Sequence, residues 1–175
     1  MPLSNTLFSQ KIYWLSQLSG ELPETNLITD YIRPALYTGK HQSVTFDLAD
    51  DLSESIFRLT QKSNFSIYLV LLSALNLLLY RYTGNNDVIV GSPVYRPDSS
   101  YERSNKLVPL RSKVSHQLSC KDFLLHVKDT TIGAYSHYYP LDDLIQLLKL
   151  PKTQNRCPIF DIMLLLDNIH DKKAI

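Results

Sequence analysis

The stretch from Asn64 to Arg96, NFSIYLVLLSALNLLLYRYTGNNDVIVGSPVYR, constrains the fold of this 175-residue chain more than any other part. Its first half is apolar nearly all round, and leucines and isoleucine recur there at helical spacing: Ile67, Leu71, Leu75 and Leu78. Residues 83–86, Thr-Gly-Asn-Asn, then form a turn signal before a β-branched run. The pattern predicts a helix at the centre of a core, followed by a strand over residues 88–94.

A transmembrane helix is the alternative interpretation of this apolar run. Ser73, Asn76 and Arg81 interrupt it, whereas a membrane span needs roughly 18 or more consecutive apolar residues. We therefore expect a buried helix and no membrane partner.

The composition fits one globular domain, or part of one, with a sizeable core. Apolar residues make up 44% of the chain and charged residues 20%. The 18 basic and 17 acidic residues nearly balance, so no electrostatic reason exists to expect nucleic acid or an anionic membrane as partner. The eleven tyrosines are scattered and do not alternate with Lys and Arg as a base-stacking surface would.

The two cysteines, Cys120 and Cys157, fit buried thiols better than a disulfide. The N-terminal sequence MPLSNTLFSQ lacks the basic and apolar regions of a signal peptide. Both observations favour a reducing, cytoplasmic location.

Further elements are predicted from periodicity and turn signals in the first third of the chain. A helix is expected over residues 4–18, ended by Ser19-Gly20, and an irregular connector over residues 21–42. The alternation in Ser43–Leu48 predicts a strand. A helix with Leu52, Ile56 and Leu59 on one side should follow, capped by Asp50 or Asp51.

The second half of the chain mixes helices and strands. Residues 97–104 are polar and turn-rich, and residues 107–114 predict a strand that Pro109 moves toward a sheet edge or a bulge. Ser119 with Asp122 resembles a capping box for a helix carrying Phe123, Leu124, Val127 and Ala134. Pro140 should begin a short helix lined by Leu141, Leu144, Ile145 and Leu148, residues 159–166 an inner strand, and residues 167–175 a frayed tail. The predicted class is α and β, with helices packed on a mixed sheet.

No self-sufficient catalytic or metal site is predicted. The five histidines (His41, His116, His126, His137 and His170) are not at metal-ligand spacing, and the cysteines are too far apart for a CxxC site. The sequence has no glycine-rich phosphate loop, and the Gly-Ser-Pro at residue 91 lacks the GxSxG context of a nucleophile elbow.

His137 and Arg111 are the residues that invite a functional interpretation. His137 precedes Asp142 and Asp143, and an Asp near a His suggests an oriented general base. The structural alternative, which we favour, packs His137 beside tyrosines at a turn between helices, with the two aspartates in the first turn of the next helix. Arg111 likewise fits half-buried structure better than a substrate clamp.

Four ordered blocks resemble the C-terminal lobe of nonribosomal peptide synthetase condensation domains. Residues 13–23 resemble the YW..L.G.LP segment that heads that lobe, and residues 79–94 resemble the LL.RY.GQ.D..VGSPV block most specifically. Residues 134–141 are similar to the AY.HQDYPFE motif or its HYPL variant, and residues 155–163 to SRNPLFDVMF. These blocks span nearly the whole chain in the family's order.

The sequence also departs from the family pattern. The family's catalytic HHxxxDG motif, on the N-terminal lobe, is absent, and His137 cannot replace it because Asp142 lies five residues on with no Gly after it. Of the (I/V)GFFVNTxxxR motif, residues 103–111 keep only Arg111 as the matching position. The chain ends soon after residues 160–168, where the family's lobe continues. We therefore expect residues 1–175 to be a partial, truncated condensation domain.

The resemblance implies a chloramphenicol-acetyltransferase-like half-domain that supplies one wall of a site whose histidine lies on the other lobe. It implies no catalytic residue here; the family-motif positions, expected to be structural or to line the tunnel wall, are Gly91, Ser92, Pro93, Arg111, His137, Pro140, Arg156 and Pro158. No cofactor should bind directly, because phosphopantetheine arrives on partner carrier proteins.

The partners that the resemblance implies are peptidyl or acyl carrier domains and an N-terminal lobe or another synthetase module. Self-association through the exposed lobe face is a further expectation. The predicted function is amide-bond formation between carrier-bound groups after pairing with a His-bearing lobe. A non-catalytic adaptor and a functionless remnant remain the alternatives.

Overall fold

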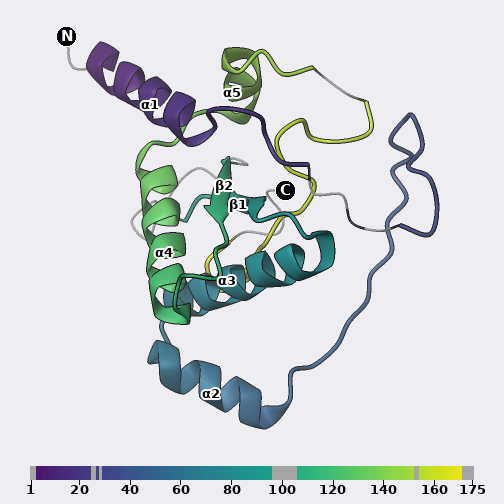
Figure 1. The fold of residues 1–175 in the computed structure, drawn as a ribbon, viewed down its shortest axis with the longest axis vertical. Coiled ribbons are helices and arrows are strands. Elements are labelled where there is room, and N and C mark those ends of the chain that lie inside the picture. Colours follow the sequence, from purple (N-terminus) through teal and green to yellow (C-terminus); the bar gives the residue numbers. More distant parts are fainter. Residues whose placement is uncertain (1–2, 25–26, 28, 96–105, 152–153, 171–175) are drawn as a thin grey trace.

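The computed structural model describes residues 3–24, 27, 29–95, 106–151 and 154–170. Figure 1 shows helices around a small central sheet. The elements run in the order α1 (Leu3–Gln17), α2 (Asp50–Thr60), α3 (Asn64–Thr83), β1 (Asp87–Pro93), β2 (Leu107–Lys113), α4 (Cys120–Ser136) and α5 (Leu141–Leu147). The predicted α and β class is confirmed, and the predicted turn at 97–104 lies outside the described residues.

The sheet is an antiparallel pair of strands, β1 and β2, with Gly91 opposite Pro109. The N–H and C=O of Gly91 point away from β2, because they bond Ile162 and Leu164 on the other side. Gly91 and Pro109 therefore form a non-hydrogen-bonded pair, and the proline nitrogen faces the open edge of β2. Pro109 removes no bond from this ladder, and the prediction of an edge strand is confirmed for the described residues.

The predicted inner strand at residues 159–166 is wrong as a regular strand. This segment runs beside β1 but makes one isolated parallel bridge, Gly91 to Met163. The Gly91 N–H donates to Ile162 O at 2.8 Å, and the Leu164 N–H donates to Gly91 O at 3.0 Å. The apolar side chains hold the segment against the sheet without a continuous ladder.

Helix α3 is buried on one side only, which corrects the prediction of a helix at the centre of the core. Its packed side carries six buried residues: Tyr68, Leu69, Leu72, Ser73, Asn76 and Leu79. The opposite side is bare, with Leu77 and Leu78 exposed. Ser63 caps its N-terminus and Gly84, with φ of 70°, ends it in the left-handed conformation.

Of the described helices, α3 is the one long and apolar enough to cross a membrane, a test that core helices of soluble proteins also pass. Its packed side contacts α2, α4 and β1. Asn76 is fully buried on that side. This packing favours the interpretation as a core helix over a membrane span.

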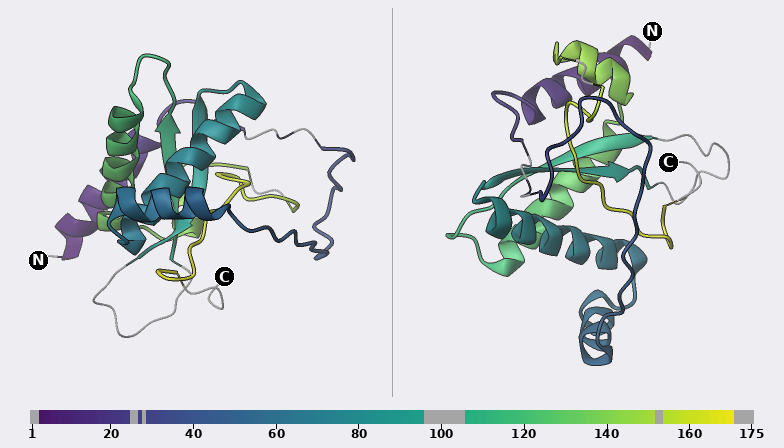
Figure 2. Two further views of the ribbon diagram at one scale, coloured as in Figure 1. Left: turned by 90° about the horizontal axis from the view of Figure 1, so that it is seen from below. Right: turned by 90° about the vertical axis from the view of Figure 1, so that its right-hand side faces the viewer.

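Helices α1, α4 and α5 complete the body. Figure 2 shows α1 and α5 together at one end, with α4 running along the sheet. Trp14 is 1% exposed and its indole N–H donates to the carbonyl of His137 at 2.7 Å, which fixes α1 to the end of α4. The predicted cap is confirmed, since Ser119 Oγ accepts the Asp122 N–H at 3.2 Å.

Smaller predictions fare differently. The cap of α2 is Ala49, so Asp50 and Asp51 lie within its first turn. Both cysteines are free, as predicted, but Cys120 is exposed and Cys157 half-buried rather than both being buried. Residues 167–170 of the predicted frayed tail form a turn in which His170 is buried; residues 171–175 lie outside the described residues.

The predicted strand Ser43–Leu48 is wrong in this structure. Among the described residues, 18–49 contain no helix or strand, and every residue from 31 to 50 is exposed. Figure 1 shows this segment running down one side of the body before it enters α2. The alternating residues lack a partner strand, and a strand cannot form alone.

Replacing Gly91 should destabilise the fold, because an added Cβ would lie 2.4 Å from the ring of Phe160. We expect Gly91→Ala to lower the free energy of unfolding by about 1–3 kcal/mol in urea titrations. In a Phe160→Ala background the same substitution should cost much less, since the clashing ring is gone. An equal cost in both backgrounds would contradict the assignment of the effect to this contact.

Candidate functional site

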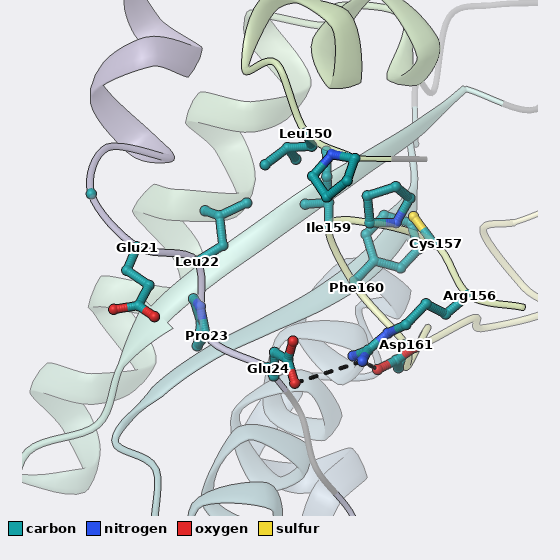
Figure 3. Close-up of a pocket in the computed structure, with 13 residues that line it drawn as sticks. Glu21, Leu22, Pro23, Glu24, Leu150, Arg156, Cys157, Ile159, Phe160 and Asp161 are labelled. Atoms are coloured by element: carbon teal, nitrogen blue, oxygen red, sulfur yellow. Dashed lines mark hydrogen bonds and ion pairs between the residues drawn. The ribbon is translucent and has the colours of Figure 1, made fainter. Parts of the chain in front are cut away.

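The candidate site is a pocket between the chain after α1 and residues 156–161, which come just before the residues that bond to Gly91 (Figure 3). Its volume is about 420 Å³. Two family-like blocks line it, together with Leu150 and Pro151: residues 20–24 on one wall and residues 156–161 on the other. Segments more than a hundred positions apart in sequence thus form the two walls.

Charged groups close one side of the pocket. Arg156 pairs with Asp161 through its Nη2 atom, and its Nη1 atom lies 3.7 Å from a carboxylate oxygen of Glu24. Arg33 approaches the other Asp161 oxygen at 3.5 Å. Figure 3 shows Glu24 and Arg156 reaching toward each other from opposite walls. Because carboxylates already neutralise Arg156, the described residues of the lining offer no free cation to an anionic ligand.

Arg111 holds the wall formed by residues 20–24. Its guanidinium makes a two-pronged contact with Asp87, with Nε–Oδ1 at 2.9 Å and Nη2–Oδ2 at 2.7 Å. It also donates to the carbonyls of Ser19 at 2.7 Å and Glu21 at 3.0 Å. This one side chain therefore ties β1, β2 and the chain leaving α1 together, and it is structural rather than a free substrate clamp.

Gly91 positions the opposite wall. Its absence of a side chain lets the Phe160 ring lie directly over the strand. The two backbone bonds from Gly91 to Ile162 and Leu164 then fix the chain that follows Phe160. Cys157 and Pro158 enter the pocket from this same segment (Figure 3 labels Cys157).

Ser92 is the centre of a buried hydroxyl network. Its Oγ accepts from Tyr68 Oη at 2.6 Å and lies 2.8 Å from Tyr135 Oη, and it donates to the carbonyl of Pro93 at 2.9 Å. Burial raises the pKa of Tyr135 to about 12, and burial also raises the pKa of Tyr68. Both phenols stay protonated near neutral pH, so the network supports the packing of α3 and α4 on β1.

His137 and Pro140 lie at the turn between α4 and α5, away from the pocket lining. The His137 ring stacks on Tyr13 with centroids 4.3 Å apart, and its Nδ1 lies 2.9 Å from the carbonyl of Gly133. Pro140 is the N-cap of α5, and Asp142 and Asp143 are in its first turn. This geometry corresponds to the structural alternative for His137.

The described lining of the pocket has no histidine for proton transfer. Its carboxylates are Glu21, Glu24 and Asp161, and the last two pair with Arg156, so Cys157 has no imidazole base beside it within the lining. Among the described residues, no group of three His, Cys, Asp or Glu side chains could hold a metal ion. Its lining combines Leu22, Ile159 and Phe160 with charges at one side, which suits an apolar or neutral group.

Of the eight family-motif positions, Arg156 and Pro158 line the pocket directly, and Gly91 and Arg111 hold its walls from outside. Ser92, Pro93, His137 and Pro140 lie elsewhere. Sequence reasoning missed the roles of Glu21, Glu24 and Asp161, for which no spacing signal exists because the two walls are remote in sequence. It also missed the hydroxyl network around Ser92. The signal for Tyr68 was its place on an apolar helix that leads into the strand with the Gly-Ser-Pro sequence.

Comparison with known proteins identifies one family. The condensation-domain family profile matches residues 2–175. Gramicidin S synthase 2 of Brevibacillus brevis is 32% identical over 177 aligned positions, covering 98% of this chain and 4% of that protein. Tyrocidine synthase 3 of Brevibacillus parabrevis is 34% identical, covering 93% of this chain and 3% of its own. The chain thus spans a small fraction of these relatives.

Solved structures share the fold. The X-domain from teicoplanin biosynthesis matches 97% of this chain and 39% of its own, with a TM-score of 0.81 and 22% identity. A four-domain nonribosomal peptide synthetase bound to AMP and glycine matches 88% of this chain and 12% of its own, with a TM-score of 0.75 and 18% identity. The predicted acetyltransferase-like fold class is confirmed by these neighbours.

Replacing Arg111 by lysine should be destabilising although it keeps the charge. Lysine cannot reproduce the fork on Asp87 together with the carbonyl contacts, and we expect a loss of about 2 kcal/mol in the free energy of unfolding. Arg81→Lys, at an exposed position in the last turn of α3, is the matched control and should change stability by less than about 0.5 kcal/mol. Equal effects of the two substitutions would refute the role of Arg111.

His170 should make the protein sensitive to mild acid. Burial lowers its pKa from 6.5 to about 4, and its Nδ1 accepts the Leu166 N–H at 3.0 Å. As pH falls from 6.5 toward 4, the unfolded chain gains a proton on this residue before the folded chain does, so stability is lost over that window. Urea titrations at several pH values should show a shallower loss for His170→Gln than for the native chain. The exposed His126→Gln should leave the slope unchanged.

Proposed function

Because this chain belongs to the condensation-domain family of nonribosomal peptide synthetases, we propose that it forms the C-terminal wall of a condensation site. In this role it takes part in amide-bond formation between carrier-bound acyl and aminoacyl groups. Chemistry requires a second lobe that carries the HHxxxDG histidine. The single observation that supports this assignment of the wall to one lobe and the histidine to another is the family match over residues 2–175 in a sequence with no His-His pair.

The structure supports the same proposal through what its pocket lacks. The lining residues include no histidine, and Arg111, Ser92 and His137 are engaged in structural contacts. A positioned general base contributes roughly a hundred- to ten-thousand-fold to rate, so the isolated chain should show little or no amide formation. Positioning of two carrier-bound substrates likewise needs both walls of the site.

Bare apolar surface supports association with a partner. Large exposed apolar side chains occur on the outer sides of several helices: Leu7, Phe8 and Ile12 on α1, Leu52, Phe57 and Leu59 on α2, and Leu77 and Leu78 on α3. A contiguous patch of exposed apolar side chains is typical of an interface, and α2 carries three such side chains within one short helix. The partner is then an N-terminal lobe or another synthetase module, with carrier domains delivering substrates on phosphopantetheine.

The second candidate function is a non-catalytic adaptor that binds a carrier protein or a synthetase module. The same bare helices and the histidine-free pocket favour it. Both functions fit a reducing cytoplasm, in keeping with the free thiols of Cys120 and Cys157.

One reconstitution separates these functions. The chain is incubated with loaded donor and acceptor carriers, with and without a separately expressed lobe carrying HHxxxDG. We expect amide product, detected by mass spectrometry, only when the lobe is present. A lobe whose second motif histidine is replaced by alanine is the control and should lower the rate at least about a hundredfold.

Two other outcomes redirect the assignment. Carrier binding without product under any condition would support the adaptor. Product from the isolated chain would contradict the requirement for a second lobe. If neither carrier binding nor amide product is detected, both candidate functions are contradicted.

A further inference from the structure

The core between α3 and the sheet contains polar side chains without a hydrogen-bond partner. Among the described residues, four buried side-chain atoms make no hydrogen bond, and three of them are Asn76 Nδ2, Asn76 Oδ1 and Ser112 Oγ. Asn76 is 0% exposed and Ser112 is 1% exposed. A buried polar group without a partner costs about as much free energy as a lost hydrogen bond, and buried polar groups in native proteins are therefore nearly always bonded.

Ser112 lies on the face of the sheet that carries the hydroxyl network of Ser92. It is opposite Val88 in the register of β1 and β2. Val88 and Ser92 are four residues apart on β1, and both alternate residues and directly opposed residues share one face of a sheet. Ser92 contacts Tyr68 of α3 and Tyr135 of α4 on this face. The Ser112 hydroxyl therefore points into the core that the two helices cover.

Asn76 lies over the same end of this face. Helix α3 runs antiparallel to β1, because the turn of residues 84–86 joins them at one end and Tyr68 bonds Ser92 at the other. The eight residues from Tyr68 to Asn76 extend about 12 Å along a helix. The four strand positions from Ser92 back to Val88 extend about 13 Å. The Asn76 amide is thus directed toward Val88 and its partner on β2.

The unpaired atoms suit a small neutral ligand that both donates and accepts hydrogen bonds. The side chains of Asn76 and Ser112 do not bond each other, and one water molecule joins polar atoms about 5–6 Å apart. A further segment of polypeptide is too large, because the described residues already cover Asn76 completely. A metal ion is disfavoured as well, since the Asn76 Nδ2 group is a donor and neither side chain carries a negative charge.

From these observations we propose that Asn76 and Ser112 together bind one internal water molecule between α3 and β2. The water donates to Asn76 Oδ1 and Ser112 Oγ and accepts from Asn76 Nδ2. These contacts give it three hydrogen bonds, the number typical of a buried water. The site is independent of the proposed function, since all its groups belong to this chain.

This site fixes the rotation of α3 on the sheet. The helix is apolar nearly all round, so burial of apolar surface alone does not specify which side faces the sheet. The bond from Tyr68 to Ser92 orients the first part of the helix, and the water bound by Asn76 orients its middle. A buried polar side chain specifies the register of packed helices in the same way. Leu77 and Leu78 are thereby kept on the exposed side.

The first test detects the water in the full chain by nuclear magnetic resonance. The Asn76 side-chain amide protons should give cross-peaks to water that change sign between laboratory-frame and rotating-frame Overhauser spectra, as a long-lived bound water does. Cross-peaks of one sign in both spectra report proton exchange instead. The exposed Gln146 amide on α5 is the internal control and should give no sign change. Absence of the sign change at Asn76 would overturn the inference, as would a crystal structure in which Asn76 and Ser112 bond directly.

The second test asks whether the two residues share one ligand. Asn76→Ala and Ser112→Ala should each lower the melting temperature by about 2–8 °C. The double variant should lose clearly less than the sum, because either substitution already removes a partner of the same water. Gln146→Ala, which removes an exposed amide, is the matched control and should change the melting temperature by less than about 2 °C.

Circular dichroism establishes that each variant is folded. If Asn76→Ala does not fold, Asn76→Leu takes its place in the same cycle, since leucine keeps a similar shape without the amide. Additive losses in the cycle, or unchanged melting temperatures in both single variants, would overturn the shared water site.

Discussion

The contacts of Arg111 are the interaction on which the rest of the structure depends. Residues 20–24, which follow α1, are neither helix nor strand, yet they form a wall of the pocket. The guanidinium supplies what secondary structure does not, since it binds Asp87 on β1 and the carbonyls of Ser19 and Glu21 together. Because Arg111 lies on β2, the two-stranded sheet holds the chain after α1 in place.

The sequence predicted those elements whose signals are local. Gly84 in the predicted turn ends α3, Ser119 caps α4 and Pro140 precedes α5, because caps and turn residues act within a few positions. The strands that failed are those that require a distant partner. Residues 43–48 have none among the described residues, and residues 159–166 make one bridge instead of a ladder. The pocket escaped prediction for the same reason, since contacts such as Arg156 with Glu24 join remote segments.

Helix α3 was predicted correctly as a helix, but only one of its sides is covered by the rest of the structure. Its sequence is apolar nearly all round, which in a finished core requires cover on every side. The sheet and α4 cover the side that carries Tyr68 and Leu72, and Leu78 is left 52% exposed. Apolar side chains on α2, such as Leu59, and in residues 31–49, such as Val44, are exposed as well. In the proposed function, the bare side is the surface against which the partner lobe or module packs.

The family-like block that identifies the chain does structural work. Gly91 allows the Phe160 ring to approach the strand, Ser92 satisfies two buried phenols, and the carbonyl of Pro93 accepts from the Ser92 hydroxyl. Each of these side chains is committed to packing and has no group free to transfer a proton. The same commitment holds for Arg111 and for Arg156, which carboxylates neutralise. Residues that specify this fold therefore build and hold a wall. In the proposed function, a bond that forms against that wall uses a reactive group supplied by the second lobe.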